Sequence, residues 1–523
     1  MRRLSGLDPM FFYLETPTAH MQVAYVCILD PSTAPGGYSF AGVRAHLEQR
    51  LHLLPPFRRR LVEVPLGLDH PRWVEDPDFD LDHHLHRVVI ASPGGESELA
   101  EFTAAVLSQP LDRSRPPWEM YVIEGLQEGL VASLTRVHHA AIDGVSGEEL
   151  VVNLLDLAPE PAVVDPPDPP WEPERVPCDL KLVGDALVQL CRRPAAATRA
   201  AWRTVRAGEN LLGHARRAGF SAVSLPLAAP RTSLGVPLGS ERRVAFAQVS
   251  LDEVKSVKAA FDVTVNDVVL AMCSGALRHH LAVSDDRTQT SAVAIVPVSV
   301  RTELERGTMG NRLSAMFVSL ASTLDDPVQR LRAIGHATQA AKAQERAAGL
   351  DSVGSAWIEA AVPALVAPAI RLSSRLGVVR RVRPGNVIIS NVVGPLDALY
   401  FAGARLVAAY PMGPIMDGIG LNITVQSYLG SLHFGLMASP NTVPDLWNLA
   451  DGLTDALHEL VKAASLRPGS KNDCPFCDRT DEHEHQVKHF RGGLSLIVGR
   501  GRRPLEWVGD SGSAGHEVCG QYV

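Results

Sequence analysis

The sequence lacks the features of several large protein classes. No apolar core of a signal peptide follows the first residues, Met1-Arg2-Arg3. It has no long basic run interleaved with aromatic residues, which argues against a nucleic-acid-binding protein. Cysteine is scarce, and four of the seven, Cys27, Cys178, Cys191 and Cys273, are scattered singly, which favours reduced thiols over a disulfide framework. These absences predict a cytoplasmic protein.

Two uncharged stretches have the composition of membrane spans, but neither has the required pattern. Residues Ala360 to Ile370 fall short of the roughly 20 residues that a spanning helix needs, and two prolines interrupt them. Residues Gly418 to Pro444 are long enough, but polar and apolar residues alternate from Leu421 to Gln426. This alternation predicts a β-hairpin. Any membrane contact is therefore expected to be peripheral.

The sequence does contain enough apolar residues for large cores. Its 523 residues are 46% hydrophobic, the formal net charge is -8, and the length suggests two or three domains. A proline-rich stretch, Ala158 to Pro177, has the composition of a linker. We predict an N-terminal domain over residues 1–160, a linker with basic amphipathic helices over 161–240, a C-terminal domain over 241–466 and a tail over 467–523.

The motif with the clearest chemistry is a pair of adjacent histidines, His138 and His139, followed by Asp143 and Gly144. It comes directly after the apolar run Leu130 to Val137, which is typical of a buried strand, and before the signals of a helix start. The segment is predicted to be strand, tight turn and helix. Glycine permits a sharp turn after the aspartate, which would leave the histidine at the end of the strand facing a cavity.

Histidine suits general-base catalysis because its ordinary pKa of about 6.5 lies close to working pH. Side chains alternate across a strand, so only one of His138 and His139 can face a given reaction centre, and the other is structural. Alternation alone does not distinguish the two. The alternative interpretation of the motif is a core histidine that is hydrogen-bonded to a carboxylate.

A second stretch, Thr264-Val265-Asn266-Asp267, leads a predicted helix. Asn266 and Asp267 are both good N-cap residues, which is a purely structural role. A helix N-terminus also directs free N–H groups outward, and an amide side chain adds a donor, so this end can stabilise a developing oxyanion. Capping and catalysis both remain open for Asn266.

The segment H-H-x-x-x-D-G resembles the acyltransferase signature shared by chloramphenicol acetyltransferase, carnitine acyltransferases and peptide-synthetase condensation domains. Within this superfamily, the chain is similar to the bacterial wax ester synthase/diacylglycerol acyltransferase family from Leu4 to about Leu466. The opening Leu7-Asp8-Pro9-Met10-Phe11-Phe12, the Asn266-Asp267 stretch and Val387 to Pro395 all resemble elements of that family.

The resemblance implies an α/β (α+β) fold of two chloramphenicol-acetyltransferase-like domains, with mixed sheets flanked by helices and the active site in a tunnel between them. It implies that His139 is the base that removes a proton from an alcohol as the alcohol attacks a long-chain acyl-CoA. The acceptor is then diacylglycerol or a fatty alcohol, the product is triacylglycerol or wax ester, and no cofactor is expected. By analogy with the superfamily, Asp143 pairs with an arginine, for which Arg301 is our candidate.

Two further motifs are explained more simply by structure than by chemistry. The histidines His83, His84 and His86 have no additional ligand at a helpful spacing, so a solvated or locally bonded cluster is favoured over a metal site. Pro116-Pro117-Trp118 resembles the P-L-W element of the family with one residue changed. We interpret it as a turn fixed by proline and anchored by a buried tryptophan.

A basic amphipathic stretch from Leu180 to Leu212 is predicted to be helical and broken at Pro194. Such a stretch can lie on an anionic membrane surface, although packing against the two domains with a solvated arginine face is the favoured alternative. The expected partners are acyl-CoA, its acceptor and, peripherally, the inner membrane or lipid droplets.

The tail departs from the family. Cys474 and Cys477 form a C-x-x-C, and His483 and His485 follow it, so these four side chains can hold zinc in tetrahedral geometry. An unstructured polar tail is the favoured alternative.

Two other functions remain open. A condensation-type enzyme would take its acyl group from a carrier-protein thioester and would need a surface for the carrier, and no fused carrier domain is expected here. A non-catalytic lipid-droplet surface protein would not need an intact motif at His139, Asp143 and Gly144.

Overall fold

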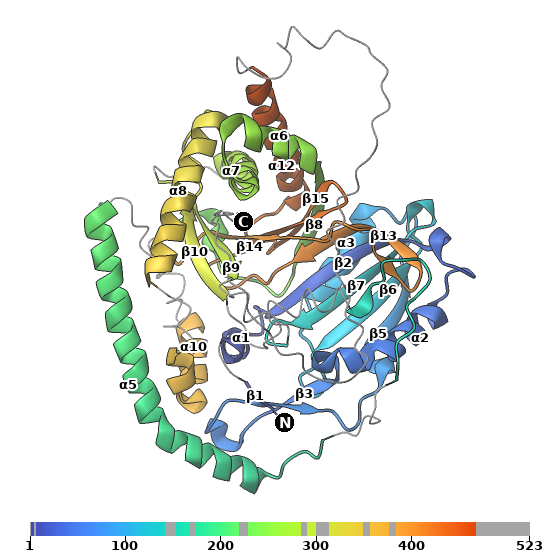
Figure 1. The fold of residues 1–523 in the computed structure, drawn as a ribbon, viewed down its shortest axis with the longest axis vertical. Coiled ribbons are helices and arrows are strands. Elements are labelled where there is room, and N and C mark those ends of the chain that lie inside the picture. Colours follow the sequence, from blue (N-terminus) through green and yellow to red (C-terminus); the bar gives the residue numbers. More distant parts are fainter. Residues whose placement is uncertain are drawn as a thin grey trace, which may run out of the picture. The chain divides into compact units, whose positions relative to one another are not determined.

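Two six-stranded sheets form the framework of the protein, and helices pack against them (Figure 1). The computed structural model describes residues 2–4, 7–141, 153–166, 174–218, 229–283, 290–299, 313–348, 356–375 and 383–466.

The first sheet has the strand order β12-β13-β2-β7-β6-β5. Neighbouring strands are antiparallel except for β5 and β6, which are parallel. The strands are β12 (Tyr400–Phe401), β13 (Ala404–Met412), β2 (Gln22–Asp30), β7 (Val131–His138), β6 (Trp118–Glu124) and β5 (Leu85–Val89). Alternate residues of β2 pack in two different cores, because Leu29 belongs to one hydrophobic cluster and Ala24 and Val26 belong to another.

The second sheet has the strand order β10-β9-β11-β14-β15-β8. The two pairings of β11, with β9 and with β14, are parallel, and the others are antiparallel. The strands are β10 (Leu313–Ser319), β9 (Val293–Ser299), β11 (Val387–Val392), β14 (Leu421–Tyr428), β15 (Ser431–Ala438) and β8 (Arg243–Ser250). A third, small sheet contains β1 (Arg2–Arg3), β4 (Arg72–Glu75) and β3 (Arg59–Val62).

The helices divide between the two large sheets. In the second half of the chain, α6, α7, α8 and α12 gather on one face of the second sheet and share a core with it (Figure 1). The helices are α1 (Asp8–Leu14), α2 (Phe40–Arg50), α3 (Glu96–Leu107), α5 (Asp179–Ala218), α6 (Leu251–Phe261), α7 (Val265–Val283), α8 (Pro327–Ala348), α10 (Pro363–Arg375) and α12 (Leu446–Ser465). The predicted class, mixed sheets flanked by helices, is confirmed.

The two halves are joined by two strands of the second half that pair in the first sheet. β12 and β13 come from the second half of the sequence, yet they pair in the first sheet, where β13 lies beside β2. The range 241–466 therefore supplies strands to both sheets. The chain as far as Ser465 forms one compact unit, and the predicted domain bounds stay predictions.

Two of the local predictions can be compared directly with the structure. The stretch from Gly418 to Pro444 is a hairpin, as predicted: β14 and β15 pair in register around Leu429 and Gly430, both of which have positive φ as tight hairpin turns require. The predicted break at Pro194 is wrong, because α5 continues through it. Pro194 lies on the exposed side of α5, so water can bond the carbonyl that its ring leaves without an N–H partner.

Among the described helices, no single one is long and apolar enough to cross a membrane. The helices α6 and α7, which are bent by 104° at the break between them, meet the criterion of length and composition only as a pair.

Candidate active site

The two histidines of the motif lie at the end of a central strand. β7 ends at His138, and His139 is the first residue of the turn that follows. Backbone hydrogen bonds fix both residues, because the His138 N–H donates to the Pro117 carbonyl at 2.9 Å and the His139 N–H donates to the Met21 carbonyl at 2.7 Å. The starts of β2 and β6 therefore hold the turn in place.

Two consecutive phenylalanines of α1 stack on the two consecutive histidines. The ring centroids of Phe11 and His139 are 3.9 Å apart with 11° between the ring planes. Those of Phe12 and His138 are 4.0 Å apart with 8° between the planes. Near-parallel stacking at this distance fixes the plane of each imidazole, so α1 orients the histidine pair.

His138 has the environment of a structural histidine. It is 2% exposed, and its Nδ1 accepts the N–H of Ala140 at 3.1 Å, which leaves the proton of the neutral ring on Nε2. That Nε2 lies 3.5 Å from Oε2 of Glu15, and Arg113 forms an ion pair with the same carboxylate. Burial lowers the pKa of His138, although Glu15 opposes the shift.

Glu15 is the charged centre of this cluster. Burial alone would raise the pKa of its carboxyl, but the contacts with His138 and Arg113 outweigh burial and lower the pKa to about 2. The guanidinium of Arg113 also lies over the ring of Phe12, 5.4 Å from its centroid. Glu15 thus stays ionised and holds His138 in one orientation.

His139 differs from His138 in its exposure. It is partly exposed, unlike its neighbour His138, and its ring is held by Phe11. Burial of the ring and the adjacent His138 lower the pKa of His139 to about 4, while a backbone hydrogen bond opposes them. The imidazole is therefore neutral at pH 7 and has a nitrogen lone pair with which to accept a proton.

The histidine turn lies where the two halves of the chain meet. Behind the turn, Ala19 and Met21 pack in one cluster with Leu238 from the predicted linker range and Ile415 from the second half, and Phe11 packs against that cluster. Nearby, the guanidinium of Arg242 donates to the Thr18 carbonyl at 2.6 Å.

Two family models match this chain. The wax ester synthase/diacylglycerol acyltransferase catalytic domain matches residues 4–269, and the WS/DGAT C-terminal domain matches residues 309–461. The chain belongs to the wax ester synthase/diacylglycerol acyltransferase family. The matched ranges include His138 and His139 as well as the start of α7.

Relatives of this family support the assignment over almost the whole chain. A protein of Mycobacterium tuberculosis strain H37Rv, named "Putative diacyglycerol O-acyltransferase Rv1760", is 39% identical over 90% of this chain and 92% of its own length. The solved wax ester synthase/diacylglycerol acyltransferase from Marinobacter aquaeolei VT8 is 29% identical, with a TM-score of 0.64 over 89% of this chain and all of that chain.

Condensation domains share the fold at lower identity. The first condensation domain of the CDA synthetase is 17% identical, with a TM-score of 0.55 over 89% of this chain and 96% of that domain. At this identity the likeness concerns the fold alone. It agrees with the predicted fold, mixed sheets flanked by helices.

The structure corrects the prediction about the start of α7. The N-cap is Thr264, not Asn266 or Asp267: the Thr264 hydroxyl accepts the Asp267 N–H at 3.1 Å, and Oδ2 of Asp267 accepts the Thr264 N–H at 2.9 Å. This reciprocal pair is a capping box in which aspartate replaces glutamate. Asn266 is released from capping and is 5% exposed in the first turn of α7.

Several predicted residues lie outside the described part of the chain. They are Asp143, Gly144, Arg301, Cys474, Cys477, His483 and His485. The pairing of Asp143 with Arg301 and the zinc site of the tail therefore stay predictions.

The structure shows local packing partners for Trp118 and for His84. Trp118 is 1% exposed, stacks on Phe57, and donates its Nε1–H to the Phe57 carbonyl at 2.7 Å. Nδ1 of His84 bonds the Trp118 carbonyl at 2.8 Å, and its ring stacks between Trp118 and Phe79. His84 is thus a locally bonded core residue. Among the described residues, no group of three or more His, Cys, Asp or Glu side chains has an arrangement that could hold a metal ion.

Sequence reasoning missed the partners of the histidines: Phe11, Phe12, Glu15 and Arg113. Adjacent aromatic residues in an amphipathic start are common in cores, and nothing in the spacing connects them to a motif more than 120 residues later. The one signal in the sequence is that two consecutive phenylalanines match two consecutive histidines. This match can be recognised only after the contact between them is known.

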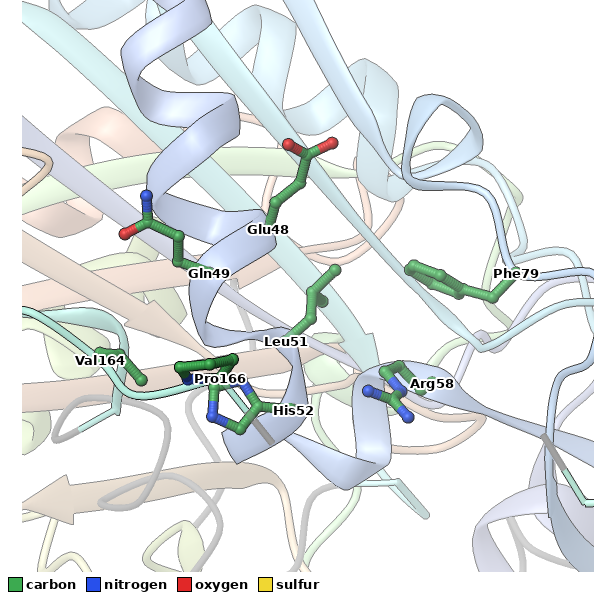
Figure 2. Close-up of a pocket in the computed structure, with 8 residues that line it drawn as sticks. All are labelled: Glu48, Gln49, Leu51, His52, Arg58, Phe79, Val164 and Pro166. Carbon is green, nitrogen blue, oxygen red and sulfur yellow. The ribbon is translucent and has the colours of Figure 1, made fainter. Parts of the chain in front are cut away.

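A separate cavity of about 350 Å³ lies on the first half of the chain (Figure 2). Its lining comes from the end of α2, the residues that follow it, the loop after β4 and the proline-rich stretch: Glu48, Gln49, Leu51, His52, Arg58, Phe79, Val164 and Pro166. Neither histidine of the motif lines it, so it is distinct from the candidate active site.

Proposed function

We propose that this protein transfers a long-chain acyl group from acyl-CoA to the hydroxyl of diacylglycerol, and also of fatty alcohols, with His139 as the general base. Membership of the family and the names of its relatives support acyl transfer to these acceptors. The observation that carries the role of His139 is the contrast within the pair. His138 is buried and held by Glu15, whereas His139 is partly exposed and neutral.

The proposed reaction is a direct transfer. His139 removes the hydroxyl proton of the acceptor as its oxygen attacks the thioester carbonyl carbon. The tetrahedral oxyanion collapses, the carbon–sulfur bond breaks, and the CoA thiolate takes the proton back from His139. Proton and acyl group are balanced, so no cofactor is required. The products are free CoA and triacylglycerol, or wax ester when the acceptor is a fatty alcohol.

The oxyanion needs donors, and the start of α7 is the proposed source. Because Thr264 and Asp267 complete the cap between them, the side-chain amide of Asn266 is not needed for capping. A buried amide can donate a hydrogen bond to a developing negative charge. Removal of one such donor typically lowers the rate by about 10²–10³-fold. Asn266 is proposed as this donor.

The proposed location is the cytoplasm, with peripheral contact to the inner membrane or to lipid droplets.

The test is release of CoA by the purified protein from palmitoyl-CoA, with dioleoylglycerol or hexadecanol as acceptor. We expect release that depends on the acceptor and falls by at least about 10³-fold in His139→Ala. The matched control is His52→Ala, a histidine of the separate cavity, which should keep full activity. No release with either acceptor from a folded protein would contradict the proposal and point to carrier-bound donors or a binding role.

A further inference from the structure

The long helix α5 has one face buried against the protein. It contacts α8 and the short turn Pro65–Gly67, and it is tied to the first half by ion pairs of Arg193 with Asp69 at 3.0 Å and Asp185 with Arg72 at 2.8 Å. The residues on this face are mostly small: Leu182, Ala186, Arg193, Ala196, Ala200 and Ala207. At 100° per residue they fall within one narrow arc of the helix.

The opposite face of α5 has many exposed apolar side chains, interrupted by the charged residues Glu209 and Arg216, whereas an ordinary surface helix exposes a polar face. Its members and their exposed fractions are Leu180 86%, Leu187 51%, Val188 52%, Leu190 38%, Trp202 66%, Val205 55% and Leu212 52%. These seven belong to a set of 22 large exposed hydrophobic residues in the described part of the chain, so α5 concentrates about a third of them. Such a stripe marks an interaction surface.

A basic flank runs beside the apolar stripe. The residues Lys181, Arg192, Arg199, Arg203 and Arg206 are exposed and lie between the buried and the apolar arcs. Over Asp179–Ala218 the sequence has eight Lys and Arg against three Asp and Glu, which is a net charge of +5. The whole chain has a net charge of -8, so the positive charge of α5 is local.

Trp357 extends the surface beyond α5. Its Nε1–H donates to Oγ1 of Thr204 at 2.8 Å, and its ring is 47% exposed. α10 follows Trp357 in the chain and has two more exposed leucines, Leu365 and Leu372. Exposed tryptophans with a polar edge and an apolar body favour the boundary between lipid headgroups and acyl chains.

We infer that the exposed face of α5 binds the surface of an anionic phospholipid bilayer. The inference rests on the peripheral membrane contact proposed above and names the surface that makes it. The apolar stripe would enter the headgroup region, and the basic flank would lie against the phosphates. A helix of 40 residues measures about 60 Å along its own axis. A second copy of the chain is disfavoured as the occupant, because two basic faces repel.

The experiment is co-sedimentation of the full chain with vesicles of phosphatidylglycerol mixed with phosphatidylcholine, beside vesicles of phosphatidylcholine alone. We expect binding to the anionic vesicles that weakens at high salt. The triple variant Leu187→Ser, Trp202→Ser, Val205→Ser should bind at least about tenfold more weakly. The triple variant Arg192→Gln, Arg199→Gln, Arg206→Gln should lose a similar factor on anionic vesicles only. Leu396→Ser, 90% exposed and outside α5, is the matched control and should bind normally.

Fluorescence separates insertion from simple charge attraction. A blue shift on addition of anionic vesicles should disappear in Trp202→Phe, because a tryptophan that enters the headgroup region leaves water. Unchanged vesicle binding in both triple variants would overturn the inference. It would also be overturned if the protein did not bind vesicles but formed an oligomer that the apolar triple variant abolishes.

The inference and the proposed activity fail in different ways. His139→Ala should bind vesicles like the unaltered protein, and the α5 variants should keep acyl transfer to a short, water-soluble alcohol. Normal vesicle binding by a chain without acyltransferase activity would refute only the activity, and normal activity of a chain that ignores anionic vesicles would refute only the surface.

Discussion

The acid limit of activity should lie far below the ordinary pKa of histidine. Burial and the adjacent His138 lower the pKa of His139 to about 4, and a general base works only in its neutral form. With a pKa of about 4, about 97% of His139 is neutral at pH 5.5; with the ordinary value of 6.5, about 9% would be neutral. The two cases differ about tenfold in rate at that pH.

The assay is kcat/KM for CoA release between pH 5 and 8, with a water-soluble alcohol as acceptor so that lipid phase behaviour does not enter. We expect kcat/KM to change by less than about twofold between pH 8 and 5.5. A reversible decline centred near pH 6.5 would refute the assignment of the shifted base to His139, because kcat/KM reports the free enzyme.

Loss of folded protein must be separated from loss of the base. Burial also lowers the pKa of His70 and of His433 to about 4, so the unfolded chain binds more protons than the folded one as the pH falls below 6.5. Each such histidine removes about 1.4 kcal/mol of stability by pH 5.5, and the loss ends near pH 4. Circular dichroism at pH 5.5 and recovery of full activity on return to pH 8 provide the control.

Three further predictions concern named parts of the structure. Phe11→Ala should remove the stack on His139 and lower kcat more than it raises KM, whereas Phe12→Ala, which frees the structural His138, should lower the melting temperature; equal effects of both changes on kcat would contradict the division of roles. Gly435→Ala should cost about 3 kcal/mol in urea unfolding, because its Cβ would lie 2.1 Å from the Pro411 carbonyl oxygen, while Gly208→Ala, with nothing within 4 Å, should be neutral or slightly stabilising. If the tail holds zinc, the purified full chain should contain about one equivalent by mass spectrometry of the metal, and Cys474→Ser with Cys477→Ser should remove it; equal metal content in both would refute the site.

Local patterns predicted the elements of the site better than their partners. The run Leu130 to Val137 and the double histidine were enough to predict a buried strand that ends at the motif, because periodicity and burial are local properties. The same holds for the hairpin of β14 and β15, whose alternation and turn are encoded within about 20 residues. Side-chain alternation could not distinguish the roles of the two histidines. It assumes that both belong to the strand, but β7 ends at His138.

Non-local pairing could not be predicted. Nothing near residues 400–412 indicates that β13 joins the sheet of β2 instead of the sheet of β14, because the partner strand is almost 400 residues away in the sequence. The capping box of Thr264 and Asp267 was overlooked because Thr264, Asn266 and Asp267 are all residue types that are favoured at an N-cap. The local sequence therefore did not decide which of them caps α7. The stacking of α1 on the histidines likewise depends on tertiary packing.

The exchange of β13 between the halves has a consequence for synthesis. Until residues 404–412 leave the ribosome, β2 has a neighbour on one side only and exposes a nine-residue open edge. The first half therefore cannot complete its sheet ahead of the second, and folding has to wait for more than 400 residues of chain. A fragment that ends before Ala404 should aggregate through β2 when expressed alone, whereas supply of the missing residues as a second polypeptide should restore solubility. For this protein the histidine turn is translated early, but the sheet that holds it is finished late.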